Sequence, residues 1–283
     1  MISKIVTHNG AWHADEVLAI ALIHLVASKD SLKEFELIRT RDVEVLSKAK
    51  QAKDTFVLDV GAEYDPENLN FDHHQRDFKK LNSFGNPMST FGLIVEYLLH
   101  EIPQEIHQDL LAFADKVDCQ DNGIQASPEL FWIAELNELE DFEVAITFSM
   151  TWLQAKFKAW FKNAEQIKIT LECIEKSENG IVASEHNSLR VGLLLNQHEH
   201  LKLIVSPSSS GGYSIQSLNV GIERDFSVRC PTPESWRGLR DQELKDVSGF
   251  EGIIFSHSTG FLTVADTYEN AMKIANYLVS VNK

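Results

Sequence analysis

Between Ser3 and Asp118, short apolar segments typical of strands alternate with segments of helical periodicity, and this alternation limits the possible folds more than any other feature. Strands are expected within 3–10, 35–41, 54–61 and 69–75, and helices within 13–28, 42–50, 89–102 and 106–118. The apolar run DTFVLDVG is typical of a buried parallel strand. Because alternating strands and helices form βα units, we predict an α/β domain whose sheet is mainly parallel and flanked by helices.

The second half of the chain has a different pattern. Residues 140–177 have helical character and contain neither proline nor glycine, which predicts one long helix or two consecutive helices. Strand and hairpin patterns follow Gly180, with a turn at Gly211 and Gly212, and a last helix is expected over 267–281. We therefore expect three parts, which are an α/β domain at 1–140, a helical connector at 141–178 and a smaller α/β domain at 179–283.

Composition and charge argue against a membrane protein, a secreted disulfide-rich protein and a general nucleic-acid-binding protein. No apolar run reaches the roughly 18 residues that a membrane span needs, and the first residues show no signal-peptide pattern. The 3 cysteines form no CxxC pair or disulfide framework, so we expect a cytoplasmic protein without a membrane partner. The formal charge of −16 argues against a broad, non-specific grip on nucleic acid, because such binding depends on lysine and arginine. It leaves open a nucleotide or a short strand held at a metal site.

Histidine and aspartate residues gather where the expected strands end. Three groups follow strands and a fourth lies on or near a helix: His8, His13 and Asp15; Asp59; Asp72, His73 and His74; and Asp115, Asp118 and Asp121. In an open α/β sheet the carboxyl ends of parallel strands share one edge, so these side chains are expected to converge. Taken singly, each has a structural explanation, since a strand-end aspartate commonly caps a turn and Asp15 suits a helix N-terminus.

Together, these groups have the chemistry of a metal site. Imidazoles and carboxylates form a mixed ligand set that shifts the preference from Mg²⁺ towards Mn²⁺, Co²⁺, Fe²⁺ or Zn²⁺. The absence of clustered cysteines argues against a structural zinc site. A strand-end carboxylate such as Asp59 could bridge two ions about 4 Å apart, an arrangement that activates water and clamps a phosphoryl oxygen.

Five segments resemble the melanocyte-proliferating-gene family, a branch of the DHH phosphoesterases. They are THNGAWHADEVLA, VLDVGAEYDPENLNFDHHQRDF, VDCQDNGI, PESWRGLRDQEL and GIIFSHSTGFL, and the resemblance extends from Thr7 to the last helix. It implies a two-domain phosphoesterase with a DHH-type catalytic domain at 1–140 and a substrate-binding domain at 179–283. The first domain would hold two divalent ions, with Mn²⁺ favoured and Mg²⁺, Co²⁺ or Zn²⁺ as alternatives.

The resemblance also implies roles for individual residues. His74 would contact the phosphate and Asp72 would orient an imidazole, so these two are assigned to catalysis. At the fourth motif Asp118 is favoured over Asp121, although either could bind metal. The implied metal ligands are His8, His13, Asp15, Asp59 as the bridge, His73, and Asp118 or Asp121. The first motif has the form His-x4-His-x-Asp, whereas wider DHH enzymes usually carry His-x3-Asp-x-Asp.

Arginines and a polar turn in the second half are candidates for substrate binding. Planar guanidinium groups can hold phosphate oxygens in two-point contacts, and short side chains after a strand allow close approach. The assigned residues are Arg76 in the first half and Arg237, Arg240, His257, Ser258 and Gly260 in the second half, which also holds Arg224 and Arg229. The alternative is a solvated face, because acidic residues nearly balance these bases. After Phe261 the chain continues LTVADT, where the family tends to carry a glycine-rich, basic segment.

The expected function is metal-dependent hydrolysis of a phosphoester. The resemblance implies a 3′–5′ exonuclease that acts on RNA or short oligonucleotides, with two ions that activate water. One alternative is a hydrolase of a small nucleotide, a cyclic dinucleotide or another phosphoester, and another is a protein that binds metal and a phosphorylated ligand without catalysis. Aromatic residues of the connector, such as Trp152 and Trp160, predict core or interface packing and are compatible with a homodimer.

Overall fold

A mainly parallel sheet forms the centre of the first half of the chain. The computed structural model describes residues 2–27, 35–139, 141–190, 192, 197–221 and 227–282. They form two compact units, Met1–Phe161 and Lys162–Lys283.

The strands of the first sheet are β1 Lys4–Thr7, β2 Glu36–Arg39, β3 Thr55–Leu58, β4 Tyr64–Asp65 and β5 Asn70–Phe71. Their order is β2-β1-β3-β5-β4, and all neighbours run parallel except β4, which pairs antiparallel with β5. The predicted α/β class is thereby confirmed.

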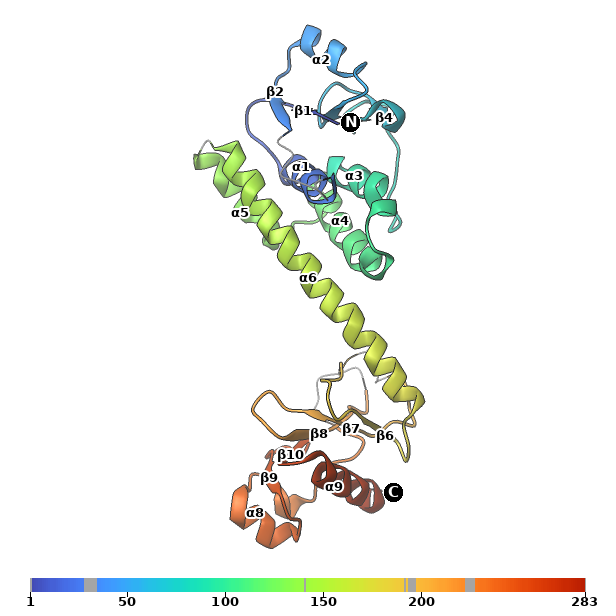
Figure 1. Cartoon of the computed structure of the whole chain (residues 1–283), viewed down its shortest axis with the longest axis vertical. Coiled ribbons are helices and arrows are strands. Elements are labelled where there is room, and N and C mark those ends of the chain that lie inside the picture. Colours follow the sequence, from blue (N-terminus) through green and yellow to red (C-terminus); the bar gives the residue numbers. More distant parts are fainter. Residues whose placement is uncertain are drawn as a thin grey trace. The chain divides into compact units, whose positions relative to one another are not determined.

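Helices cover both faces of this sheet (Figure 1). They are α1 Ala14–Ala27, α2 Val43–Ala49, α3 Thr90–Leu98, α4 His107–Asp121 and α5 Phe131–Glu135. Alternate strand residues point to opposite faces, so Ile5 and Phe56 join the main core with α1, α3 and α4, while Val6 and Val57 pack against α2. Every residue from Val17 to Ile23 is buried, which makes α1 a central helix rather than a surface helix with one apolar stripe.

The breaker-free segment forms a single helix, α6, over Phe142–Glu175. This outcome decides between the two arrangements that the sequence left open. The division between the two units falls within α6. Its first part places Phe142, Ile146 and Leu153 in the core of the first unit. The rings of Trp152 and Trp160 lie 5.4 Å and 6.0 Å from the ring of Phe113, so these aromatic residues pack inside the first unit.

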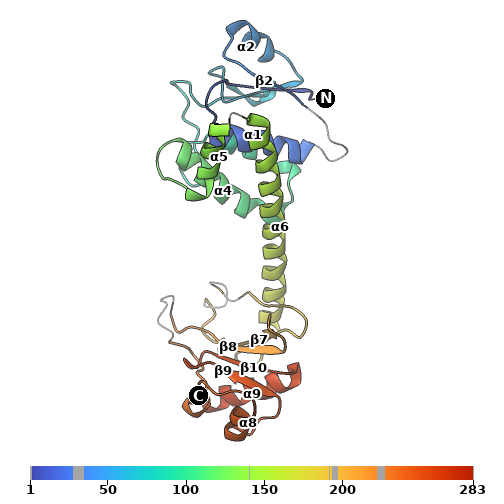
Figure 2. The same ribbon diagram turned by 90° about the vertical axis from the view of Figure 1, so that its left-hand side faces the viewer.

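The second unit is built on an antiparallel sheet to which one parallel strand is added. Its strands are β6 Ile181–Ala183, β7 Leu203–Pro207, β8 Tyr213–Ser217, β9 Ile253–Ser256 and β10 Leu262–Ala265, in the order β6-β7-β8-β10-β9. Only the β6–β7 pair is parallel among these described strands. Helix α9, Tyr268–Val281, packs on the face that carries Leu203 and Val205, and α8 is Asp241–Ser248 (Figure 2). Ile204 points to the other face, where it meets Ile174 near the end of α6.

No helix among the described residues is long and apolar enough to cross a membrane. Short 3-10 turns connect several of the helices and strands. The turns are Pro66–Asn68, Leu99–Glu101, Gln104–Ile106, Pro128–Leu130, Leu136–Leu139 and Glu234–Trp236. The β7–β8 hairpin turns at the predicted glycines. Gly212 has a φ of 70°, and a Cβ there would lie 2.3 Å from the carbonyl oxygen of Ala265, so both backbone conformation and space require glycine.

Candidate metal centre

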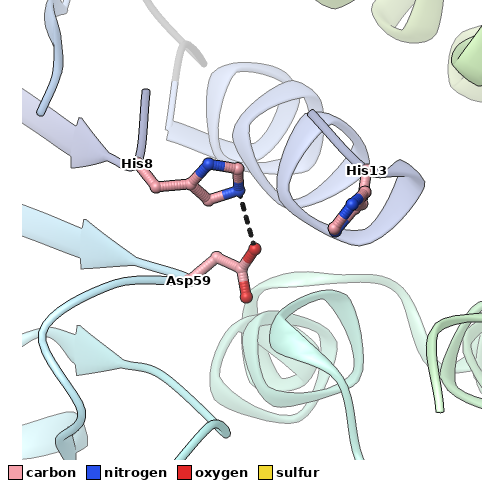
Figure 3. A group of neighbouring side chains, drawn as sticks. All are labelled: His8, His13 and Asp59. Carbon is pink, nitrogen blue, oxygen red and sulfur yellow. Dashed lines mark ion pairs between the residues drawn. The ribbon is translucent and has the colours of Figure 1, made fainter. Parts of the chain in front are cut away.

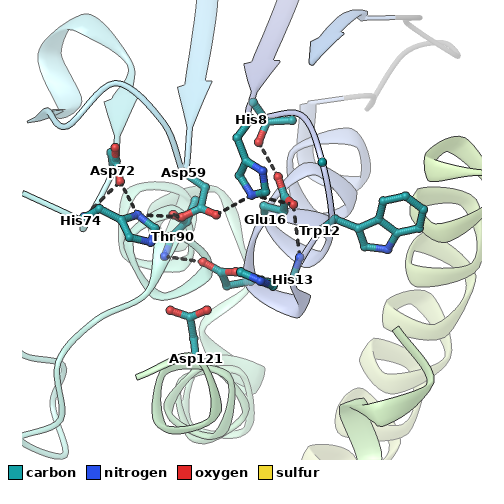
Figure 4. A network of polar contacts seen from close by, with 12 residues as sticks. His8, Trp12, His13, Glu16, Asp59, Asp72, His74, Thr90 and Asp121 are labelled. Atoms are coloured by element: carbon teal, nitrogen blue, oxygen red, sulfur yellow. Dashed lines mark hydrogen bonds and ion pairs between the residues drawn. The ribbon is translucent and has the colours of Figure 1, made fainter. Parts of the chain in front are cut away.

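The carboxyl ends of three adjacent parallel strands bring the predicted ligands to one place. His8 follows β1, Asp59 follows β3, and Asp72 begins the polar run after β5 (Figure 4). Asp59 has a φ of 55°, which lies in the left-handed region that residues other than glycine rarely adopt. Aspartate tolerates this conformation better than most residues, and such backbone strain clusters at functional sites. The geometry of the sheet edge therefore singles out Asp59.

Asp59 lies at the centre of the cluster. Its Oδ2 is 3.2 Å from Nε2 of His8 (Figure 3). Its Oδ1 is 3.3 Å from Nε2 of His73. The hydroxyl of Thr90 donates a hydrogen bond of 3.0 Å to the same Oδ1. The Asp59 side chain is 1% exposed, so these contacts are made in a poorly solvated environment where charge interactions are strong.

The described residues form three overlapping groups of potential metal ligands. Within each group, one ligand atom from each residue lies within 4.8 Å of the others. The groups are His8, His13 and Asp59; Asp59, His73 and His74; and His13, Asp15 and Asp121. Asp59 and His13 each belong to two of these groups. A carboxylate shared between neighbouring ligand sets is the arrangement that a bridged pair of ions requires.

The charges at the site fit a cation. Asp15 is completely buried, and its Oδ1 has no hydrogen-bond partner among the described residues. Burial, together with the charges of Asp59 and Asp121, raises the pKa of Asp15 well above its usual range. Burial and repulsion from Asp59 also raise the pKa of Asp121, although nearby histidines oppose this rise. Divalent ions would relieve this repulsion and give the unpaired oxygen a partner, so the residues present fit the implied metal.

His8 is the histidine of this cluster whose pKa is raised most strongly. Burial lowers the pKa of His8, but contacts with Asp59 and Glu16 outweigh burial and raise that pKa to about 10. Burial favours a higher pKa for Asp59, yet the imidazoles of His73 and His8 hold it far below its usual range. A histidine binds metal in its neutral form, so metal binding by His8 must displace the proton of its imidazole.

At the fourth motif, Asp121 and Asp118 lie in different surroundings. Asp121 lies at the end of α4, with Oδ2 3.3 Å from Nε2 of His73. Asp118 is completely buried and belongs to none of the ligand groups among the described residues. Its Oδ1 accepts hydrogen bonds from the backbone N–H and hydroxyl of Ser89, at 2.8 Å and 2.7 Å, and its Oδ2 accepts one from Asn82 at 2.9 Å. Both carboxylate oxygens of Asp118 therefore hold the segment before α3, and the choice between Asp118, which the sequence favoured, and Asp121 stays a prediction.

Two residues of the cluster were missed from the sequence. Glu16 is completely buried, accepts a hydrogen bond from the Thr7 hydroxyl at 2.5 Å, and lies 3.0 Å from Nε2 of His8. It also accepts the backbone N–H of His13, the residue before α1, at 3.2 Å. A glutamate three residues after a helix cap is the capping-box pattern, so a sequence signal existed. Thr90 donates to Asp59 and, through its backbone N–H, to Asp15, and no sequence signal identified it.

His74 is oriented by Asp72. Oδ1 of Asp72 lies 2.8 Å from Nδ1 of His74 and accepts the backbone N–H of the same residue at 3.0 Å. Oδ2 accepts the N–H of Ala62 at 2.6 Å. The contact with Asp72 raises the pKa of His74, and burial opposes this rise. The His74 side chain is 58% exposed, so its ring is fixed on one side by Asp72 and accessible to a ligand on the other.

Removing this orientation should lower activity without unfolding the protein. We expect Asp72→Asn and His74→Ala each to reduce turnover of a phosphodiester by roughly 10- to 100-fold, the range seen when a ligand-orienting group is lost. Because both substitutions affect one pair, the double variant should be little worse than His74→Ala alone. Steady-state rates of the four proteins would check this, and fully multiplicative losses would contradict it.

The other substrate-binding candidates are divided between the two units. Arg76 is exposed in the first unit. Four residues lie around the β9–β10 turn, where Nε of Arg237 donates to the Thr232 carbonyl at 3.1 Å and packs against Gly260. A Cβ at Gly260, whose φ is 78°, would lie 2.7 Å from that Nε, so close packing requires glycine here. The residues at this turn are Arg237, His257, Ser258 and Gly260.

The other arginine candidates of the second unit differ in whether their guanidinium groups are free to contact a phosphate. Arg240 is 69% exposed and lies 5.6 Å from the ring of Phe255 on β9. Arg229 donates to the backbone carbonyls of Asn219, His198 and Leu201, which gives it a structural role. Arg224 lies outside the described residues. Nδ1 of His257 accepts the backbone N–H of Thr259 at 3.2 Å, which leaves Nε2 as its other ring nitrogen for a ligand.

Comparison with known proteins agrees with the motifs. A family profile described as "Uncharacterised protein family (UPF0160)", with the short name MYG1_exonuc, matches residues 4–140 and 134–279. The chain belongs to the MYG1 family. A Bos taurus member named MYG1 exonuclease is 29% identical over 96% of this chain and 83% of its own length. A Chlamydia pneumoniae MYG1 protein is 30% identical over 94% of this chain and 93% of its own. The predicted membership of the melanocyte-proliferating-gene family is therefore confirmed.

Two solved structures are distantly similar to this MYG1 family member. A pGpG-specific phosphodiesterase, PggH from Vibrio, has a TM-score of 0.34 at 11% identity and covers 99% of this chain and 98% of its own. RecJ from Thermus thermophilus, in complex with Mn²⁺, has a TM-score of 0.27 at 12% identity and covers 98% of this chain and 51% of its own. TM-scores this low do not establish a shared fold.

Proposed function

We propose that this MYG1 family member is a metal-dependent phosphoesterase, and that it acts as a 3′–5′ exonuclease on RNA or short oligonucleotides. The observation that carries the proposal is the position of Asp59, which is shared by two groups of metal ligands at the carboxyl edge of a parallel sheet. The name of the bovine relative, MYG1 exonuclease, supports the choice of activity.

The proposed cofactor is a pair of divalent ions, with Mn²⁺ favoured because histidine and carboxylate ligands are mixed. Their proposed ligands are His8, His13, Asp15, Asp59, His73 and Asp121. Such ions lower the pKa of bound water and neutralise charge on phosphoryl oxygens. The protein contributes rigid positioning, since Thr90 holds Asp59 and Glu16 lies against His8.

The remaining polar residues would bind the substrate. Asp72 fixes the ring of His74, whose exposed side can donate to a phosphate oxygen. Arg76 lies two residues further along the same segment and is exposed. In the second unit, the proposed phosphate contacts are Arg237, Arg240, His257, Ser258 and Gly260. Guanidinium groups suit this role because they bind phosphate oxygens in pairs.

A direct test combines metal analysis with an oligonucleotide assay. Purified protein is expected to hold close to two Mn²⁺ ions per chain by elemental analysis, and to release mononucleotides stepwise from 5′-labelled RNA. Failure to cleave any oligonucleotide or small phosphodiester while the ions are bound would overturn the proposal. The net charge of −16 favours short substrates, so rates on di-, tri- and longer nucleotides would separate an exonuclease from a hydrolase of small nucleotides.

The assignment of the fourth ligand can be tested with matched substitutions. Asp121→Asn should lower metal content and reduce turnover by about 100-fold, because a neutral amide is a weaker ligand than a carboxylate. Its stability should not fall, since the substitution relieves repulsion among buried carboxylates. Asp118→Asn should show the opposite pattern, with lower stability and unchanged metal content in the folded protein. Metal loss in Asp118→Asn alone would reverse the assignment.

A further inference from the structure

A cavity opens beside the proposed metal ligands, within the first unit. It measures about 200 Å³, and its lining includes His13 and Asp121. Its other walls are mainly apolar and include Trp12, Leu130 and Ala134. Drug-sized ligands occupy pockets of roughly 300–1,000 Å³, so this cavity has room for one ring system rather than for a whole dinucleotide. Apart from His13 and Asp121, its lining residues belong neither to the proposed metal ligands nor to the proposed phosphate contacts.

The wall formed by Trp12 is held rigidly in place. Its ring centroid lies 5.2 Å from that of Phe142, and the guanidinium of Arg39 lies 5.3 Å from its ring. Its backbone N–H donates to Oδ1 of Asn137 at 3.0 Å, and Nδ2 of Asn137 donates to its carbonyl at 2.9 Å. In Figure 4, Trp12 projects away from Asp59 toward the green helices. The cavity therefore has a fixed aromatic wall, and its shape does not depend on a mobile side chain.

The polar groups of the cavity match an uncharged ring with hydrogen-bonding edges. Gln120 lines it, and Oε1 of Gln120 accepts the backbone N–H of Ser127 at 3.0 Å. This bond fixes the amide orientation and leaves the NH₂ group as the donor offered to a ligand. Asp121 makes the metal end unfavourable for a second anion, while the apolar walls favour a flat, neutral group. A nucleobase has this combination of an apolar face and polar edge acceptors.

We propose that this cavity binds the nucleobase adjoining the phosphate held at the metal site, so that the protein recognises nucleotides rather than phosphoesters in general. This inference rests on the proposed function for the position of the phosphate. The ring would enter between Trp12 and Ala134, with an edge acceptor bound to the amide of Gln120. Every base has a π-face that can contact an aromatic ring. We therefore expect the protein to bind a nucleotide with any base more tightly than the same sugar phosphate without a base.

Equilibrium binding tests this inference without requiring turnover. Mn²⁺-loaded protein is titrated by calorimetry with adenosine 5′-monophosphate, uridine 5′-monophosphate and ribose 5-phosphate, which share the sugar phosphate and differ in the base. We expect both nucleotides to bind at least about tenfold more tightly than ribose 5-phosphate. Equal affinities for all three in the wild-type protein would overturn the inference.

Two matched substitutions test whether the preference for nucleotides arises in this cavity. Ala134 is exposed on α5 and lines the cavity, so Ala134→Leu should block it and abolish the preference for nucleotides over ribose 5-phosphate. Ala155 is exposed on α6 and does not line this cavity, so Ala155→Leu should retain the preference. A preference that survives Ala134→Leu would also overturn the inference. The absence of nuclease activity in the wild-type protein, with the nucleotide preference intact, would overturn the proposed function and leave the base site standing.

Discussion

Replacing Asp59 with asparagine is expected to remove bound metal and to reduce phosphodiester turnover by about 1,000-fold or more. Asp59 lies within contact distance of both His8 and His73, and it is shared by two of the three ligand groups. A neutral amide cannot balance the charge of two cations as a bridging carboxylate does. The metal contribution amounts to several kcal/mol, and each 1.36 kcal/mol corresponds to about a tenfold change in rate. Elemental analysis and initial rates on labelled RNA would measure the two losses.

A matched control is available in the same region of the chain. Asp77 lies in the segment after β5, is exposed, and belongs to none of the ligand groups of the described residues. Asp77→Asn makes the same chemical change and should leave metal content and rate at wild-type values. Circular dichroism would verify that both variants fold. An Asp59→Asn protein that kept its metal and its rate to within a few-fold would refute the bridging role.

Adding a single methyl group at Gly92 is expected to destabilise the first unit by about 3 kcal/mol or more. Alanine normally stabilises a helix interior by roughly 0.5–1 kcal/mol relative to glycine. At Gly92, within α3, a Cβ would lie 2.4 Å from Oδ1 and 2.7 Å from Oδ2 of Asp118. To avoid this clash, the buried Asp118 carboxylate would have to move away from its hydrogen-bond donors Ser89 and Asn82. The free-energy cost of overpacking is then added to the cost of the lost hydrogen bonds.

Urea unfolding followed by tryptophan fluorescence would measure this effect. Four of the 5 tryptophans, Trp12, Trp132, Trp152 and Trp160, lie in the first unit, so fluorescence reports mainly on that unit. In an Asp118→Ala background the carboxylate is gone, and Gly92→Ala should then cost little or stabilise the helix. A Gly92→Ala protein at least as stable as wild type would show that α3 and α4 are not packed as described.

Local patterns were sufficient to predict the α/β class and most of the proposed ligands. Strand and helix periodicities depend on neighbouring residues, and parallel strands place their carboxyl ends at one edge whatever the details of packing. For this reason His8, Asp59 and His73 could be grouped from their positions after strands. The sequence did not decide whether the segment 140–177 forms one long helix or two, because it lacks helix breakers but does not exclude an interruption. The structure shows the single helix α6.

Only the tertiary structure gives a physical reason to propose Asp121 rather than Asp118, two residues that lie one turn apart on α4. The choice depends on Ser89 and Asn82, which lie about thirty residues earlier and occupy both oxygens of Asp118. Thr90 is likewise recognised only once α3 packs beside β3 and β5. In physical terms, the sequence determined which groups of this protein can bind metal, since that follows from their chemistry and local position. Packing between distant segments gives the reason to propose Asp121, because both oxygens of Asp118 already accept hydrogen bonds from Ser89 and Asn82.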